Sequence, residues 1–204
     1  KVSRQETFNG MTPSQVLISI IENPRFWYEV PMIYLERGNT EIRNLINVPV
    51  TATHARLSDF LTNKGAYKIE EKVAEAQKKN IKNKFEKDLI KIDQRVGLLY
   101  NAIYGTIFKI FPIPNDPNNK WVSQPETLMA GFKGTDSVFV RQVLPVYTQM
   151  LQKAKESNDY TQVDKVLKGI KNYQNKFGAT CQSMCFYKHR CVNHVFYLAH
   201  QYLI

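Results

Sequence analysis

The side chains with the most reactive chemistry lie at the C-terminal end of this 204-residue sequence, in residues 179–204. This tail contains all three cysteines and three of the four histidines. A helix would place one group of three on a single face and bring a second pair together, because their spacings are three or four residues. Thiolates and imidazoles arranged in this way could hold zinc or a soft metal tetrahedrally. The candidate ligands are Cys181, Cys185, His189, Cys191 and His194.

The spacing of these ligands matches no standard zinc-finger pattern, so three other interpretations of the tail stay open. It could be an apolar terminal helix with incidental cysteines. It could form a disulfide in an oxidising compartment, which would leave one thiol over. It could also be an unrelated extension that replaces the natural continuation, because the composition changes abruptly after Gly178. The remaining histidine, His54, has no acid or cysteine at ligand spacing.

The rest of the sequence carries no catalytic pattern. We find no His-Glu metal helix, nucleophile elbow, phosphate loop or glycine-rich dinucleotide turn. Glu86, Asp88 and Asp93 fall on a predicted helix, and we interpret them as a solvated face rather than an acid–base pair. No reaction can be read from the residues, and we do not expect this segment to be an enzyme.

The composition, 43% hydrophobic with a net charge of +10, is that of a globular domain with a basic excess. This excess favours an anionic neighbour such as lipid headgroups, nucleic acid or an acidic partner. It is densest in KKNIKNK, residues 78–84, which we interpret as a solvated helix face. Nucleic acid is not expected, because no nucleic-acid-binding module is recognisable. No apolar run reaches the roughly 18 residues of a membrane span, so we expect a soluble chain. Its start at Lys1, without methionine, suggests a piece of a longer protein.

The hydrophobic pattern predicts a mainly α-helical fold, an irregular helical domain with at most short strands. Its central element is one long helix over residues 67–111, which is expected to bend or break near residues 78–84, where the apolar stripe fades. Pro112 ends this helix. The stripe that defines it recurs in steps of three and four, at Phe85, Leu89, Ile92, Val96, Leu99, Ile103, Ile107 and Ile110.

Shorter elements are expected on either side of the long helix. Thr12, Pro13 and Gln15 form a helix start with a capping box. Asn23-Pro24 ends that helix, and FWYEVPMIYLE follows as an extended segment or short strand. Residues 136–177 form a helical hairpin that closes at Gly178. We therefore expect a helical core domain over 1–134, a hairpin over 135–178 packed on it, and the atypical tail 179–204.

The loop after the long helix, PIPNDPNNKW, is dense in turn-forming residues, and loops of this kind often carry function. The tryptophan that closes it could be an exposed recognition residue or a plug that fixes the loop to the core. We name as candidate binding surface Phe111, Pro112, Asp116, Asn119 and Trp121.

Four phrases carry a family resemblance that covers about residues 1–178. In chain order they are KVSRQETFNGMTPSQV, NKFEKDLIKIDQRV, FKIFPIPNDPNNKW and GIKNYQNKFGA. With them the sequence resembles the extracytoplasmic region of large bacterial cytochrome c biogenesis proteins of the CcsA/ResB, or system II, type. In that family the complete membrane protein exports haem and assists its covalent attachment to the CxxCH cysteines of apocytochrome c on the periplasmic side.

The resemblance implies a soluble periplasmic segment of a cytochrome c maturation protein, which docks or scaffolds rather than catalyses. Its implied partners are the membrane-embedded remainder of that protein and apocytochrome c, with haem a possible cofactor that the tail ligands could contact. The family's tryptophan-rich haem motif and membrane histidines cannot be placed on this chain, whose two tryptophans, Trp27 and Trp121, lie far apart. The tail departs from the family and is not CxxCH. The alternative is a free-standing helical adaptor with a basic face for an anionic partner or membrane surface.

Overall fold

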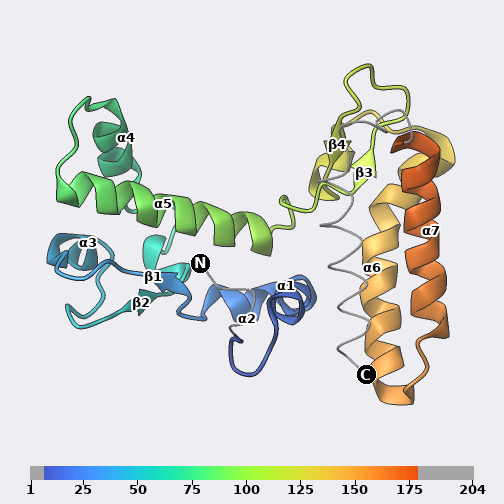
Figure 1. Cartoon of the computed structure of the whole chain (residues 1–204), viewed down its shortest axis with the longest axis horizontal. Coiled ribbons are helices and arrows are strands. Elements are labelled where there is room, and N and C mark those ends of the chain that lie inside the picture. The colour runs from blue at the N-terminus through green and yellow to red at the C-terminus, as the bar shows by residue number, and fades with distance from the viewer. Residues whose placement is uncertain (1–6, 179–204) are drawn as a thin grey trace. The chain divides into compact units, whose positions relative to one another are not determined.

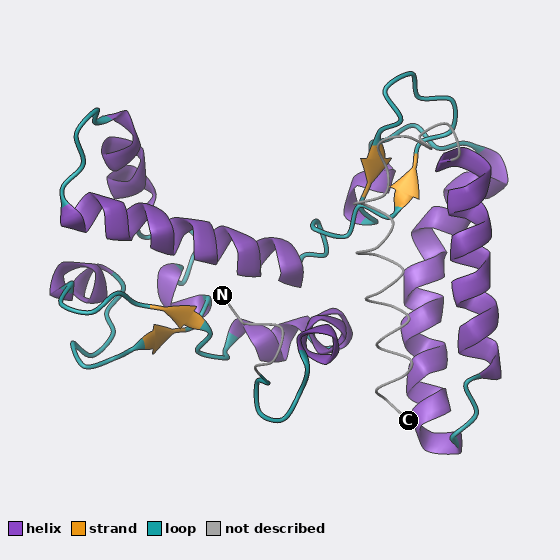
Figure 2. Ribbon diagram, viewed as in Figure 1, coloured by secondary structure: helices purple, strands orange, loops and turns teal. Residues whose placement is uncertain are grey.

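The structure, a computed structural model, describes residues 7–178 and divides them into two compact units (Figures 1 and 2). The middle unit is the contiguous stretch 23–103. The N/C unit combines residues 7–22 with residues 104–178. Each unit has its own buried core and is described separately.

The middle unit is built on its last helix, α5, which contacts α4, β1, α2 and α3. The two strands pair antiparallel, with Ile33 opposite Ala55. Leu89 and Ile92 on α5 are buried, as is the indole of Trp27 on α2. In chain order the elements are α2 (Pro24–Tyr28), β1 (Ile33–Tyr34), α3 (Thr40–Leu45), β2 (His54–Ala55), the 3₁₀ helix η1 (Ser58–Phe60), α4 (Glu70–Lys78) and α5 (Lys84–Ile103).

The N/C unit is dominated by a pair of adjacent long helices, α6 and α7, joined by a short turn (Figure 1). Its core gathers Ile18 from α1, Phe111 from β3 and Tyr147 from α6. The strands β3 and β4 pair antiparallel, with Phe111 opposite Val122. In chain order the elements are α1 (Pro13–Glu22), β3 (Phe111–Pro112), β4 (Trp121–Val122), the 3₁₀ helix η2 (Pro125–Leu128), α6 (Gly134–Ser157) and α7 (Thr161–Gly178).

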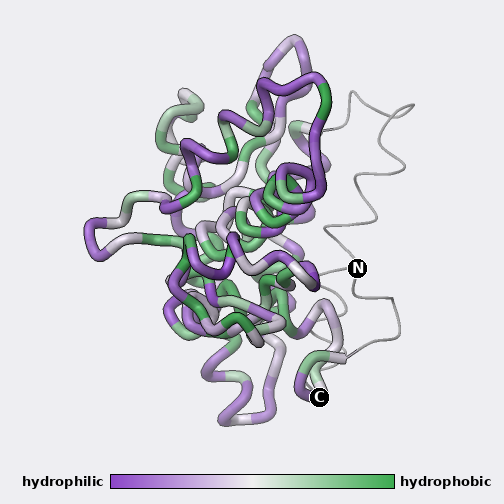
Figure 3. Tube along the Cα trace, turned by 90° about the vertical axis from the view of Figure 1, so that its left-hand side faces the viewer, coloured by the Kyte–Doolittle hydropathy of each residue, from purple (hydrophilic) through white to green (hydrophobic). Residues whose placement is uncertain are grey.

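This architecture confirms the mainly helical fold class, the short strands and the C-terminal helical hairpin. Within residues 7–178, none of the helices combines the length and hydrophobicity that a membrane span requires. Figure 3 shows hydrophobic and hydrophilic residues alternating along the described trace, as expected of helices with one buried face.

The break expected near residues 78–84 is confirmed, because the stretch predicted as one long helix over residues 67–111 forms two helices, α4 and α5, separated at residues 79–83. The break falls in the lysine-rich stretch where the apolar stripe fades. The predicted C-terminal end is wrong, since α5 ends at Ile103 rather than at Phe111. Gly105 follows in the left-handed region, with φ of 71°, and this conformation stops the helix before the prolines are reached.

The predicted start of α1 is confirmed in detail. The backbone N–H of Gln15 donates to Thr12 Oγ1 at 3.3 Å, and the N–H of Thr12 donates to Gln15 Oε1 at 2.8 Å. These are the two reciprocal bonds of a capping box. The extended segment predicted after Asn23-Pro24 is wrong in its first part, because Pro24 opens α2 and the Asn23 side chain caps it. Asn-Pro thus starts a helix as well as ending one.

The grouping of the elements also differs from the division drawn from the sequence. The contacts join α6 and α7 to α1 and to residues 104–133, and leave residues 23–103 as a separate unit. The sequence placed its boundary after residue 134 instead. Hydrophobic periodicity locates helices but does not indicate which distant helices share a core. The local sequence therefore could not predict that residues from 104 onward pack with α1.

The middle unit contains a buried arginine whose charge is held by backbone carbonyls. Arg43 on α3 is 4% exposed. Its guanidinium donates to the carbonyl oxygens of Ala52 at 2.9 Å and Asn39 at 2.7 Å. It also donates to those of Glu36 at 3.0 Å and Leu35 at 3.4 Å. The Arg43 side chain therefore links the segment around β1 to the turn before β2. Neither segment is paired with another strand along its whole length.

Replacement of Arg43 by lysine should destabilise the middle unit. A lysine keeps the charge but has three donors on one nitrogen, so at least one buried carbonyl loses its partner. We expect a loss of about 2 kcal/mol in the free energy of unfolding, measured by urea denaturation followed by circular dichroism. The matched control is Arg25→Lys at an exposed position of α2, which should change stability by less than about 0.5 kcal/mol. Equal effects of the two substitutions would contradict the assigned role of Arg43.

Candidate functional site

The cysteine and histidine ligands proposed in the tail, Cys181, Cys185, His189, Cys191 and His194, lie outside the described residues, so their metal or haem site stays a prediction. Within residues 7–178, histidine, cysteine, aspartate and glutamate form no group of three or more that could hold a metal ion. The described histidine, His54, is exposed on β2 and its Nδ1 lies 3.1 Å from Thr53 Oγ1.

The binding loop predicted between β3 and β4 begins with two residues that the structure places in the core. Phe111 is fully buried, and its ring meets the edge of Tyr173 on α7 at a centroid distance of 6.4 Å. Pro112 is buried beside it and pairs with Trp121 across the two strands. Phe111 and Pro112 therefore anchor the loop and are not available on the surface.

The middle of this loop is held by its own aspartate. Asp116 Oδ1 accepts the backbone N–H of Asn118 at 2.9 Å and that of Lys120 at 3.1 Å. Asn115 and Asn119 both adopt positive φ, at 59° and 49°, which asparagine tolerates better than most residues. The carboxylate thus shapes the turn, and Asp116 and Asn119 remain partly exposed at its rim.

Trp121 closes the loop against the end of α7. A Cβ atom built on Gly178 would lie 2.6 Å from Cζ2 of the Trp121 indole, a distance that real Cβ atoms essentially never show. The indole therefore occupies the space that a side chain at residue 178 would need. This geometry supports the plug interpretation of Trp121, although the ring remains partly exposed.

A carboxylate follows Trp121 and fixes the turn into η2. Glu126 accepts hydrogen bonds from Ser123 N–H at 2.7 Å and Ser123 Oγ at 2.6 Å, and it pairs with Lys109. Desolvation raises the pKa of this carboxyl, but the bonds from Lys109 and Ser123 outweigh it and lower the pKa to about 2. Ser123 itself is fully buried. The role of Glu126 is structural, since its donors are Ser123 in the turn and Lys109 before β3.

An open apolar groove runs along α6 and α7 and has a volume of 380 Å³. Its floor includes Phe139, whose ring stacks on Tyr173 with centroids 5.1 Å apart. Lys165 is its one titratable side chain, so the groove can hold an apolar group but offers no acid–base pair. The residues that line it are Phe139, Gln142, Val143, Val146, Met150, Gln162, Lys165, Val166 and Gly169.

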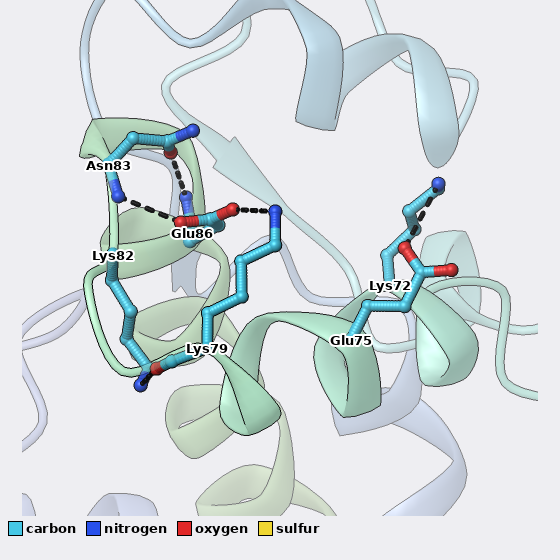
Figure 4. Close-up of polar contacts among 6 residues, drawn as sticks. All are labelled: Lys72, Glu75, Lys79, Lys82, Asn83 and Glu86. Carbon is cyan, nitrogen blue, oxygen red and sulfur yellow. Dashed lines mark hydrogen bonds and ion pairs between the residues drawn. The ribbon is translucent and has the colours of Figure 1, made fainter.

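The acidic residues of α5 are not a solvated face, and that interpretation is wrong for Glu86 and Asp88, which are each 5% exposed. Glu86 Oε2 accepts the backbone N–H of Asn83 at 2.8 Å, while Asn83 Oδ1 accepts the N–H of Glu86 at 3.0 Å, a capping box that starts α5 (Figure 4). Lys79 pairs with the same carboxylate, and these two bonds lower the pKa of Glu86. Asp88 accepts a bond from Asn39 at 3.4 Å.

Asp93 has a structural partner as well. The hydroxyl of Tyr67 donates to Asp93 Oδ1 at 3.0 Å. Burial and this neighbouring carboxylate raise the pKa of Tyr67 above its usual value, so the phenol stays protonated. Glu86, Asp88 and Asp93 therefore each serve a cap or a buried hydrogen bond, and no two of them are arranged as a general acid and base.

Sequence reasoning missed the groove and the Gly178–Trp121 contact. One feature of the local sequence indicated the groove: the apolar stripe of α6 is wider than a single buried face requires. Tyr147 and Leu151 are buried, whereas Val138 and Val146 on the same helix are 55% and 37% exposed. The contact of Trp121 with Gly178 could not be predicted from the local sequence, since it joins a strand to the last residue of a distant helix.

Comparison with known proteins gives one relationship. No family model matches the chain. Among curated proteins, it is 29% identical over 180 residues to Protein NrfI of Wolinella succinogenes. The match covers 87% of this chain and 19% of NrfI, so the chain spans about a fifth of the length of this relative. The two proteins are distantly related over nearly all of the present sequence.

Replacement of Gly178 by alanine should destabilise the N/C unit. The new Cβ would overlap the Trp121 ring, and the displaced indole should cost about 1–3 kcal/mol in the free energy of unfolding. The control is Gly169→Ala on the same helix, whose Cβ would meet Phe139 at an ordinary 3.8 Å. That substitution should be neutral or stabilise by up to about 1 kcal/mol. Chemical denaturation of both variants checks the difference, and a Gly178→Ala protein as stable as the control would refute it.

The lowered pKa of Glu126 predicts a stability change at acid pH. Its folded-state pKa of about 2 lies below the ordinary 4.5, so its ionised form stabilises the folded state above about pH 4.5. That contribution is lost as the pH falls from 4.5 toward 2. The difference in melting temperature between wild type and Glu126→Gln should therefore be largest near neutral pH and smallest near pH 2. Ser123→Ala removes one donor and should shrink the difference. A difference independent of pH would contradict this assignment.

Proposed function

We propose that this chain is an extracytoplasmic segment of a longer bacterial cytochrome c biogenesis protein, and that it docks or supports rather than performs the chemistry. The observation that carries the proposal is the relationship to NrfI over 87% of the chain. The match to 19% of NrfI fits a segment of a much longer protein. The proposed location is the periplasmic side of the bacterial inner membrane.

The roles of the charged side chains support docking or scaffolding. Glu86 completes the capping box of α5, Glu126 holds the turn before η2, and Asp93 accepts a bond from the partly buried Tyr67. The groove on α6 and α7 has Lys165 as its one titratable lining residue. A reaction would need at least one nucleophile or acid–base pair with a free reacting atom, and the described acids just named are engaged in holding the fold.

Haem does not fit the residues that the structure describes. His54, the histidine among residues 7–178, lies exposed on a two-residue strand, where its ring contacts Tyr34 at a centroid distance of 5.5 Å. No haem step is therefore assigned to the described residues. The proposed partners are the membrane-embedded remainder of the protein, which would handle haem, and apocytochrome c. Candidate contact positions for them are the exposed rim of the β3–β4 loop, at Asp116, Asn119 and Trp121.

The proposal is tested by removing the segment from the gene that encodes it. An in-frame deletion of codons 7–178 should lower covalently bound haem in c-type cytochromes by more than about tenfold, because the remaining protein would lose a docking surface. Haem-dependent peroxidase staining of separated cytochromes measures the loss. Unchanged staining would refute the proposal and favour a free-standing adaptor with another task.

Conservative variants separate support from catalysis in the same assay. Asp93→Asn and Glu126→Gln keep the shape of each side chain but remove its charge. Both should retain most of the covalent haem, provided that immunoblots show normal protein levels. Loss of the haem signal from either variant at a normal protein level would show that a carboxylate reacts, and would refute the non-catalytic role.

A further inference from the structure

The corner between α4 and α5, residues 78–87, presents a hydrophobic side chain among lysines. Ile81 is 91% exposed, one of the most exposed large hydrophobic side chains of the described residues. The ten residues of the corner contain five lysines and one glutamate, a net charge of +4. Four of these lysines are exposed and the fifth is partly exposed, at Lys78, Lys79, Lys82, Lys84 and Lys87.

The acidic side chains near the corner do not cancel its charge toward solvent. Glu86 is buried, and its carboxylate is turned inward to Asn83 and Lys79 (Figure 4). Glu75 lies on α4 and pairs with Lys72 at 3.3 Å. The ion pair with Glu86 partly neutralises Lys79, whereas Lys78 and Lys87 have no ion pair among the described residues.

The corner is held in shape by the same contacts. The capping box of Asn83 and Glu86 fixes the first turn of α5, and the Lys79–Glu86 pair ties the end of α4 to that turn. Lys82 donates to the carbonyl oxygen of Lys79 and closes the turn that carries Ile81 (Figure 4). Ile81 is thus displayed by a preorganised loop, which lowers the ordering cost of binding.

We propose that this corner binds the anionic surface of a lipid bilayer, with Ile81 inserted at the boundary of headgroups and acyl chains. The lysines would contact lipid phosphates, and their methylene stems can follow the apolar side chain into the interface. A folded acidic partner would need a pocket for Ile81, whereas a bilayer accepts a single apolar side chain without shape complementarity. The inference goes beyond the proposed function and does not depend on it, because it concerns the lipid and not the cytochrome.

Vesicle sedimentation with the purified 204-residue chain tests the proposal. The chain should bind phosphatidylcholine vesicles that contain phosphatidylglycerol, and bind pure phosphatidylcholine much less. Lys78→Gln combined with Lys87→Gln should lower the partition coefficient about 25-fold, because each lysine near an anionic surface contributes about fivefold. Ile81→Ser should lower it about tenfold, through loss of apolar burial in the interface. Circular dichroism should show all variants folded, since the three side chains are exposed.

Two matched controls separate the corner from the overall charge of +10. Lys153→Gln combined with Lys171→Gln makes the same charge change at exposed positions of α6 and α7, and Val50→Ser removes another exposed aliphatic side chain. Both should leave the partition coefficient within about twofold of wild type. Equal losses in the controls would overturn the proposal in favour of diffuse electrostatic adsorption. Normal vesicle binding by Ile81→Ser would overturn it too, and would favour an acidic protein as the partner of the lysines.

Discussion

Buried backbone carbonyls need hydrogen-bond donors, and this constraint shapes both units because their strands are only two residues long. Side chains supply the donors that a larger sheet would supply. Arg43 serves four carbonyls in the middle unit, and Lys68 bonds the carbonyl of Asp59 at 2.7 Å. In the N/C unit, buried Gln174 donates to the carbonyl of Ile110 at 3.0 Å. Long polar side chains thus take the place of neighbouring strands as hydrogen-bond partners of the irregular backbone.

Local features of the fold could be predicted from the sequence, because their causes lie within a few residues. The capping box at Thr12 and Gln15 depends on two side chains three apart, and the buried stripe of α5 depends on helical periodicity. The burial of Glu86 could not be read in the same way. A carboxylate on a charged helix is usually solvated. Its capping bond with Asn83 is as local as that of Thr12 and Gln15, but only the turn between α4 and α5 brings Lys79 to it.

The candidate site was harder to predict than the fold. Phe111 follows a helix and precedes a proline-rich loop, and its sequence surroundings are typical of a surface. Its burial arises from Tyr173, on a helix far along the chain. The sequence left two roles open for Trp121, a plug and a recognition residue. Its contact with Gly178 in the structure supports the plug. Binding surfaces are made by residues that a core leaves uncovered, so they cannot be identified before the long-range contacts are known.

The two-part make-up of the N/C unit has a consequence for the order of folding. The middle unit is contiguous, so all its contacts can form once residue 103 has left the ribosome. α1 must wait for partners near the other end, as the ion pair of Glu22 with Lys155 spans 133 residues. At roughly 5–20 residues per second, this wait lasts on the order of ten seconds. In the later part of that wait, after residue 103 has emerged, the middle unit is complete while the apolar face of α1 is still exposed. This exposure makes α1 a natural target for a chaperone.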